Sequence, residues 1–389
     1  MDIIQEKIQQ VPSILNELDL DLWLVAVRET PVMCDPIIPL VTGLEATWQS
    51  YFAYTRDGRA FALIGNFDRA NYERSGHFTE VRSYVAGVKE DLRALLTELN
   101  PARIAINFSK DDPSADGLTH GMYLLLCDYL FGLPFADRLV SAETLCSRLR
   151  ARKTPSEIAC LTKAAETAEK AWQRARRRVK IGMTEIEIAG VVDDELKAAG
   201  VTPSFETIVN AGSKTDPGHG HPTDARLESG DLLHIDFGAL QDGYCSDLQR
   251  LLYVRRKGEN GVPDELRDAF ETVRDIITTT SEQCRPGKKG FEIDEIARTT
   301  LVDNGYPEYQ HALGHQLGRS VHDGGGLLGP MWERYGKTPS IPIDPGNAFT
   351  LELEIMLDGI GCVGLEEDVV IGDQGGRFLC PRQMLLDVL

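Results

Sequence analysis

Acidic side chains stand inside two apolar, strand-like stretches in the second half of the chain. Asp236 lies within LLHIDFGAL and Asp247 lies within YCSDLQRLLY. A carboxylate inside a strand that packs into a core costs several kcal/mol unless it is hydrogen-bonded or paired with a cation. These two residues therefore indicate either a hydrogen-bonded pair at a turn or a cation site.

A turn signal between the two aspartates predicts their register. Asp242-Gly243 is a strong signal for a two-residue hairpin turn. A hairpin closed there pairs Asp236 with Gln249 and Asp247 with Gly238. Because side chains alternate between the two faces of a strand, Asp236 and Asp247 are then diagonal neighbours on one face.

A second predicted hairpin repeats this arrangement with glutamates. Glu352 lies in AFTLELEIML and Glu366 lies in CVGLEEDVVI, on either side of Asp358-Gly359. The two glutamates face each other only if the loop has an odd number of residues, such as Asp358-Gly359-Ile360 with a left-handed or bulged glycine. Glu354 shares the face of Glu352, and Glu367 replaces Glu366 if the register slips by one residue. Spacing alone leaves these choices open.

Histidines gather in the same part of the sequence. His234 lies there together with five of the other histidines: His219, His221, His311, His315 and His322. Oxygen ligands with one or two imidazoles suit hard or borderline divalent ions such as Mn²⁺, Co²⁺ or Zn²⁺. Four carboxylates nearly neutralise two such ions, which predicts a dinuclear centre with metals about 3.5–4 Å apart.

The order of these residues resembles that of the pita-bread metallopeptidases, which include methionine aminopeptidase, Xaa-Pro aminopeptidase and Xaa-Pro dipeptidase (prolidase). The matching stretches are HIDFGALQDGYCSDLQR, HALGHQLGRSVHD, FTLELEIM and VGLEEDVVI, in family order within residues 155–389. The resemblance implies an α+β chain with a C-terminal pita-bread catalytic domain. It also implies a smaller N-terminal α/β domain, similar to the one that precedes the catalytic domain in prolidases and creatinases.

The resemblance also implies a role for each candidate ligand. Five residues match the metal ligands of the family: Asp236, Asp247, His315, Glu352 and Glu366. Asp247 and Glu366 would bridge both ions. Asp236 would bind one ion, and His315 with Glu352 would bind the other.

Two further histidines complete the site that the resemblance implies. His219, in HGHPTD, matches the family histidine before the first strand, and His322 matches the one after the metal histidine. His221 is the less favoured alternative to His219. A water that bridges two divalent ions loses its proton near neutral pH, and the resulting hydroxide attacks the scissile carbonyl. Glu352 would be the general base, while the histidines would bind substrate and stabilise the oxyanion.

Two positions depart from the family pattern. Leu353-Glu354 follows Glu352 where the family often has Pro-Gly, and Gly364 stands where prolidase-like relatives often carry an arginine close to the metals. Recognition of a substrate carboxylate then needs another group. Three residues are candidates: Arg319, Arg334 and His221. Trp332 and Tyr335, in PMWERYG, either wall a pocket for a prolyl ring or pack within a surface loop.

Local signals divide the chain near residue 150, into domains 1–150 and 151–389. The first part alternates apolar runs such as Leu22–Val27 with helical patterns such as Lys89–Leu99, which is typical of an α/β domain. In relatives this domain supports dimerisation and narrows access to the site. Helices and mostly antiparallel hairpins indicate an α+β second domain. Two of its predicted helices begin at the capping boxes that Thr154 and Thr184 open. Two more are predicted over Asp264–Gln283 and Glu292–Asn304.

Composition argues against several classes of partner. The 389 residues include 60 acidic and 41 basic side chains, for a net charge of −19. Such a surface repels phosphate backbones and anionic lipids, so we expect neither nucleic acid nor membrane partners. The first ten residues have acids where a secretory signal has a basic region, and the eight cysteines form no C-x-x-C pair. We therefore expect a cytoplasmic protein with reduced thiols.

Together these features predict a homodimeric, Xaa-Pro dipeptidase-like hydrolase with two divalent ions, of which Mn²⁺ is preferred. Two alternatives remain on the same fold. One is an Xaa-Pro aminopeptidase that acts on longer peptides, and the other is a small-molecule amide hydrolase similar to creatinase or ectoine hydrolase. The complete set of five matched ligands argues against a metal-free mechanism and against a non-catalytic binding module.

Overall fold

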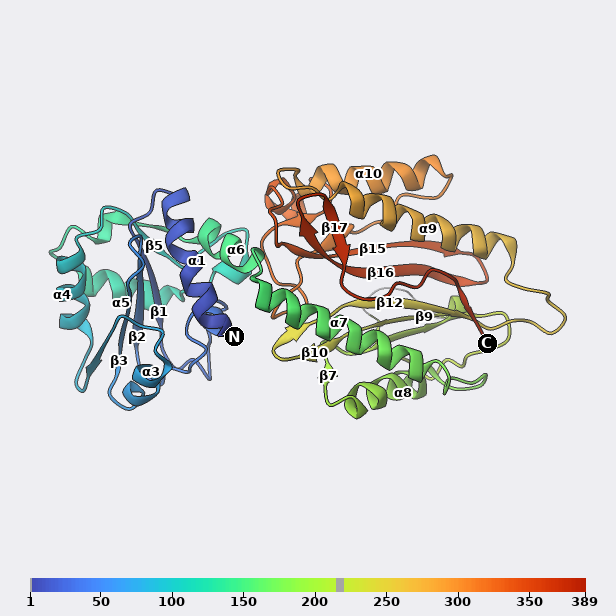
Figure 1. Cartoon of the computed structure of the whole chain (residues 1–389), viewed down its shortest axis with the longest axis horizontal. Helices are drawn as coiled ribbons and strands as arrows, with labels where there is room; N and C mark the ends of the chain where they lie inside the picture. The colour runs from blue at the N-terminus through green and yellow to red at the C-terminus, as the bar shows by residue number, and fades with distance from the viewer. Residues whose placement is uncertain (1, 215–219) are drawn as a thin grey trace. The chain divides into compact units, whose positions relative to one another are not determined.

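The chain forms two compact units in a computed structural model that describes residues 2–214 and 220–389 (Figure 1). The units are Met1–Arg150 and Ala151–Leu389. Among the described residues, no helix has the length and apolar character needed to cross a membrane.

The first unit is built on a six-stranded sheet with the order β4-β3-β2-β1-β5-β6. Its strands are β1 (Leu22–Val27), β2 (Ser50–Thr55), β3 (Ala60–Gly65), β4 (Glu80–Tyr84), β5 (Ile104–Ile106) and β6 (Leu139–Ser141). Its helices are α1 (Ile3–Glu17), α2 (Ile38–Val41), α3 (Arg69–Ser75), α4 (Lys89–Leu99), α5 (His120–Leu130) and α6 (Glu143–Ala151).

The sequence LWLVAV of β1 is apolar throughout because helices cover both faces of this sheet. Leu22 and Leu24 pack in one cluster with residues of α4 and α5. Trp23 and Val25 pack in another cluster with residues of α1 and α6. A strand that is buried on both faces has no position for a solvated polar side chain.

The second unit carries a seven-stranded sheet whose main path is β15-β16-β12-β9-β8. Its longer strands are β8 (Ile208–Ala211), β9 (Leu232–Phe237), β12 (Leu248–Tyr253), β15 (Ala348–Leu357), β16 (Gly361–Gly372) and β17 (Gly375–Phe378). Shorter strands are β7 (Thr202–Pro203), β10 (Ala239–Gln241), β11 (Tyr244–Cys245), β13 (Gly314–His315), β14 (Leu327–Leu328) and β18 (Asp387–Val388).

Four long helices cover these strands: α7 (Pro155–Ala175), α8 (Glu185–Ala198), α9 (Asp264–Gln283) and α10 (Gly290–Asp303). Helix α9 packs on β15, β16 and β17, whereas α7 packs on β10 and β11, and α8 packs on β7 and β8 (Figure 1). Both predicted capping boxes are confirmed, since Thr154 and Thr184 each exchange two hydrogen bonds with the glutamate three residues later. Helix α9 has the predicted bounds, and α10 begins two residues earlier than predicted.

The register predicted for the first hairpin is confirmed. Asp236 pairs with Gln249, and the turn between the strands has the two residues Asp242 and Gly243. Both turn residues have positive φ, 52° and 77°. A two-residue type I′ hairpin turn requires positive φ at both of these positions.

The second hairpin resolves the choice that spacing left open. Glu352 pairs directly with Glu366, and the loop has the three residues Asp358-Gly359-Ile360. Gly359 has a φ of 72°, which glycine adopts without strain. Glu367 therefore points to the opposite face of β16.

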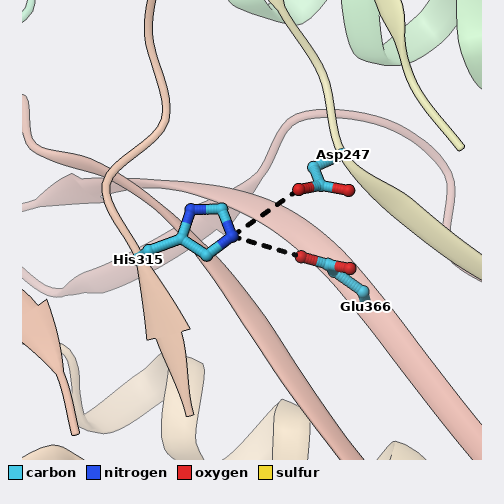
Figure 2. A group of neighbouring side chains, drawn as sticks. All are labelled: Asp247, His315 and Glu366. Carbon is cyan, nitrogen blue, oxygen red and sulfur yellow. Dashed lines mark ion pairs between the residues drawn. The ribbon is translucent and has the colours of Figure 1, made fainter. Parts of the chain in front are cut away.

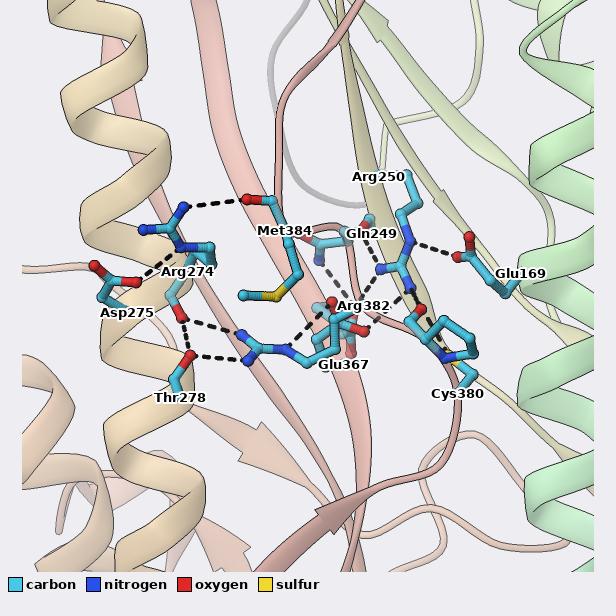
Figure 3. A network of polar contacts seen from close by, with 12 residues as sticks. Glu169, Gln249, Arg250, Arg274, Asp275, Thr278, Glu367, Cys380, Arg382 and Met384 are labelled. Atoms are coloured by element: carbon cyan, nitrogen blue, oxygen red, sulfur yellow. Dashed lines mark hydrogen bonds and ion pairs between the residues drawn. The ribbon is translucent and has the colours of Figure 1, made fainter.

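A buried ion network lies on that opposite face (Figure 3). Arg250 of β12 is fully buried, and its Nε donates to Glu169 of α7 at 2.8 Å. Its Nη2 donates to Glu367 at 3.1 Å, and its Nη1 donates to the backbone carbonyl of Glu366 at 3.1 Å. One guanidinium thus ties α7, β12 and β16 together directly behind Glu366.

We predict that Arg250→Met lowers the free energy of unfolding by about 3–5 kcal/mol, because Glu169 and Glu367 both lose their buried partner and Glu367 keeps only the longer 3.8 Å contact with Arg382. Urea unfolding followed by circular dichroism measures this loss. Lys163→Met is the matched control, since the Lys163–Asp242 pair is exposed and water screens it. Equal effects of the two substitutions would contradict the prediction.

Candidate metal centre

One transverse row of the large sheet carries most of the candidate ligands. Glu352 of β15 lies opposite Glu366 of β16, and Glu366 lies opposite Gln249 of β12. Gln249 in turn lies opposite Asp236 of β9. Paired residues project from the same face, and neighbouring strands are about 4.8 Å apart. Asp247 precedes Gln249 by two residues and shares this face.

The histidine of the site comes from a short strand that docks on β15. His315 donates its backbone N–H to Thr350 Oγ1 at 3.2 Å, and Glu352 donates its backbone N–H to the carbonyl of Leu313 at 2.7 Å. A Cβ atom on Gly314 would lie 2.0 Å from the carbonyl oxygen of Thr350. Glycine at this position therefore permits the close approach that brings the imidazole beside the row of acids.

The imidazole of His315 faces three carboxylates. Its Nε2 lies 3.6 Å from Asp247 Oδ2, 3.9 Å from Glu366 Oε1 and 3.9 Å from Glu352 Oε1. Figure 2 shows Asp247, which immediately precedes β12, and Glu366 of β16 converging on this nitrogen. One ligand atom from each of Asp247, His315 and Glu366 lies within 4.8 Å of the other two, which is compatible with coordination of a common cation.

Three carboxylate oxygens in this group are buried without a hydrogen-bond partner among the described residues: Asp236 Oδ1, Asp247 Oδ1 and Glu366 Oε1. Burial raises the pKa of Asp236 to about 7. Burial and the carboxylates of Asp236 and Glu354 raise the pKa of Glu352 to about 8. The pKa values of Asp247 and Glu366 are raised well above their ordinary range, again mainly by burial.

These orphaned oxygens and the single imidazole form a donor set that fits a hard or borderline divalent cation. Bound cations would remove the cost of burying several carboxylates side by side. The residues present thus fit the metal ions that the sequence predicts.

The row opens into a cavity of about 590 Å³, which is the size of a small-molecule site. Its wall combines the candidate ligands with apolar side chains, among them Phe205, Ile208 and Leu240. The wall also includes further sequence-predicted residues: His221, Arg319 and His322. A substrate in this cavity would contact both the acids and the histidines.

The predicted histidines have different surroundings. The ring of His322 packs edge-on against that of His315, with centroids 4.3 Å apart. His221 is mostly exposed and pairs with Glu206 at 2.8 Å. His219 lies outside the described residues. His322 is thus the histidine that the structure brings directly beside the candidate ligands.

Arg334 and its aromatic neighbours do not line the described cavity wall. The guanidinium of Arg334 stacks on Trp332 and Tyr335, at 4.6 and 4.9 Å from their ring centroids. It also donates to the backbone carbonyl of Gln310. The two aromatic rings stack on each other at 5.9 Å, so they pack within their own loop. Arg319 is the predicted arginine that does line the cavity.

Sequence reasoning assigned no functional role to two polar side chains near the ligands. Asp368 is buried on the same face of β16 as Glu366 and accepts a hydrogen bond from the backbone N–H of Asp247 at 3.2 Å. Gln249 donates to Glu366 at 2.9 Å. The signal for both was present, because strand alternation and the predicted hairpin register put them on the face of the acids.

Comparison with known proteins gives the family. The sequence profile of Metallopeptidase family M24 matches residues 159–373. The chain belongs to metallopeptidase family M24. Its second unit has the pita-bread fold, and it is an enzyme with peptidase activity from a family whose members use divalent metals.

Relatives of this M24 chain include dipeptidases and aminopeptidases. The Xaa-Pro dipeptidase of Pyrococcus furiosus is 34% identical over 234 residues, which span 59% of this chain and 63% of that relative. The solved Xaa-Pro dipeptidase from Bacillus anthracis has a TM-score of 0.76 at 24% identity, covering 99% of this chain and 100% of that one. The X-Pro aminopeptidase from Thermotoga maritima has a TM-score of 0.74 at 22% identity, with 98% and 99% covered. The fold is thus common to both activities.

We predict that the metal-free protein loses stability as pH rises. Because the pKa values of Asp236 and Glu352, about 7 and about 8, lie above their ordinary values of 3.8 and 4.5, their protonated forms favour the folded state. This stability is fully present below about pH 4 and is lost as pH rises through about 7 and 8. The unfolding temperature of EDTA-treated protein should fall over this range.

Two additions sharpen this measurement. Mn²⁺ should raise the unfolding temperature most at the alkaline end, where the carboxylates are ionised. The double variant Asp236→Asn, Glu352→Gln should have a flatter pH profile than the metal-free wild type. A metal-free wild type that is as stable at pH 9 as at pH 5 would refute the prediction.

Proposed function

We propose that this M24 enzyme is an Xaa-Pro dipeptidase that uses two divalent cations, with Mn²⁺ preferred for its hardness. The observation that carries this proposal is the convergence of four carboxylates and His315 on one cavity. The 34% identity to an Xaa-Pro dipeptidase supports the substrate class.

The proposed roles follow from where each side chain lies. Five residues would hold the cations: Asp236, Asp247, His315, Glu352 and Glu366. Divalent cations held there polarise a carbonyl group and lower the pKa of water. Glu352 is partly exposed and lines the cavity. It can therefore accept a proton and pass it to the leaving nitrogen, as a general base must.

Histidines would act on the scissile carbonyl. His322 lines the cavity and packs against His315, which supports a role in orienting the carbonyl and stabilising its oxyanion. His219 has the same proposed role from the family resemblance alone. His221 lies in the cavity wall but is mostly exposed, and it is the weaker candidate.

Arg319 would recognise the free carboxylate of a dipeptide. Its guanidinium lies over the ring of Tyr244, 5.4 Å from the centroid, and no carboxylate of the described residues forms an ion pair with it. A cation in a cavity wall that is otherwise rich in acids favours a ligand with its own negative charge. This supports a dipeptide, whose carboxylate lies next to the scissile bond, over a longer peptide.

The proposal also includes a homodimer assembled through the first unit. This unit exposes several large apolar side chains, among them Val32, Phe67, Val85 and Phe131, and exposed apolar side chains of this size favour association when they are contiguous. Sedimentation equilibrium of the full chain would measure the oligomeric state.

Peptides of two lengths test the proposed activity. We expect the Mn²⁺-loaded protein to hydrolyse Xaa-Pro dipeptides and to leave Xaa-Pro-Xaa tripeptides intact. Glu352→Gln should lower kcat by at least about 10²-fold because proton transfer is lost, with the fold checked by circular dichroism and the bound Mn²⁺ measured. Robust tripeptide cleavage would indicate an aminopeptidase, and absence of any Xaa-Pro cleavage would indicate a small-molecule amide hydrolase.

A second measurement tests recognition of the carboxylate. Arg319→Met should reduce kcat/KM for an Xaa-Pro dipeptide by about 10–100-fold, the value of a hydrogen bond to a charged group. It should change kcat/KM for the corresponding dipeptide amide much less. Arg334→Met is the matched control, because Arg334 stacks on its own loop outside the described cavity wall. Equal losses on acid and amide substrates would exclude Arg319 as the carboxylate anchor.

A further inference from the structure

The side-chain amide of Gln249 contacts two candidate ligands at once. Its Nε2 donates to Glu366 Oε2 at 2.9 Å and to Asp236 Oδ2 at 3.4 Å. The other oxygen of each carboxylate, Glu366 Oε1 or Asp236 Oδ1, is buried without a hydrogen-bond partner among the described residues. Since a primary amide has two N–H groups, Gln249 can engage one oxygen of each carboxylate and leave the second for a cation.

His234 determines which way this amide is turned. Its Nε2 lies 3.1 Å from Gln249 Oε1, and its Nδ1 lies 3.2 Å from Asn210 Oδ1. Nε2 of Gln249 already donates to the two carboxylates, so its oxygen faces His234 and accepts from Nε2–H. A neutral imidazole has only one N–H, so Nδ1 is then an acceptor, and it pairs with Asn210 when that amide is turned to present its N–H₂ group. If the Gln249 amide were rotated by 180°, its carbonyl oxygen would face the two carboxylates. Its N–H groups would then face the Nε2–H of His234. His234 therefore favours the orientation that serves the ligands.

Residue 364 provides the space for this pair. A Cβ atom on Gly364 would lie 2.7 Å from Gln249 Oε1 and 2.7 Å from His234 Nε2. The backbone of Gly364 is not in the left-handed region, so any residue could adopt its conformation. Glycine is thus needed here for space, because a larger side chain would displace the atoms that join His234 to Gln249.

We propose that Gln249 and His234 are positioning residues for the metal site, and that Gly364 is the position that admits them. This inference rests on the proposed metal-dependent function. Family resemblance leads one to expect an arginine at residue 364, close to the metals. This chain instead orients the two carboxylates with a neutral amide and imidazole, which leaves their negative charge available to the cations.

Calorimetric titration of the metal-free full chain with Mn²⁺ tests the positioning role. Gln249→Ala should weaken Mn²⁺ binding by about 10–100-fold, as loss of a residue that orients metal ligands does. His234→Phe keeps a ring of similar size and should weaken binding less. The double variant should bind no more weakly than Gln249→Ala alone, because His234 acts through Gln249.

Gln383→Ala is the matched control for a merely structural effect. Gln383 is a buried glutamine that exchanges two hydrogen bonds with the backbone of Leu251 on the same strand, β12. Its loss should lower the unfolding temperature and leave the Kd for Mn²⁺ unchanged. Wild-type affinity in both Gln249→Ala and His234→Phe would overturn the proposal, and so would additive losses in the double variant.

Substitutions at residue 364 test the space argument separately. Gly364→Ala should weaken Mn²⁺ binding in the wild-type background and have little further effect in Gln249→Ala. Gly364→Arg should weaken it more, because the larger side chain displaces Gln249 and His234 further. Wild-type affinity in Gly364→Arg would contradict the proposal. These readouts need no substrate, so a protein that binds Mn²⁺ as expected but cleaves no Xaa-Pro peptide would refute the proposed function and leave this inference standing.

Discussion

Neighbouring carboxylates on one face of a sheet repel one another, and burial raises the free energy of each further. This constraint explains the arrangement of the second unit. On β16, Glu366 faces the cavity and Glu367 faces the opposite side. Glu367 is paired with the guanidinium groups of Arg250 and Arg382, whereas the described neighbours of the Glu366 carboxylate are the amide of Gln249, the imidazole of His315 and other carboxylates. On the face of β16 that carries Glu367, the protein itself supplies the positive charge. On the face that lines the cavity, the carboxylates are left for cations from solution.

Much of the site could be predicted because its determinants are local. The Asp242-Gly243 turn specifies the pairing of Asp236 with Gln249, since a two-residue turn of this kind leaves only one register. The acids stood out because charged residues are rare in strands that pack into a core. Choosing Glu352 and Glu366 over their neighbours needed the family resemblance, and the direct pairing of these two residues agrees with that choice.

Other features escaped prediction because they depend on contacts between distant parts of the chain. Helix α1 contains Pro12 and a buried lysine, Lys7, whose ammonium donates to the carbonyl of Leu149. Neither residue is a local signal for a buried helix. The approach of His315 to the acids depends on Gly314 packing against Thr350. The meeting of His234, Gln249 and Gly364 joins three strands, and the first hairpin contains only His234 and Gln249.

The three-residue loop between β15 and β16 has a consequence for how this sequence can change in evolution. Surface loops usually tolerate insertions and deletions well. Here the gain or loss of one residue in the loop would shift β16 by one position against β15 and exchange its two faces. Glu367 would enter the cavity and Glu366 would turn toward Arg250, although the loop is about 15–20 Å from Glu366 along an extended strand. The length of this loop should therefore be under stronger selection than the identity of its exposed side chains.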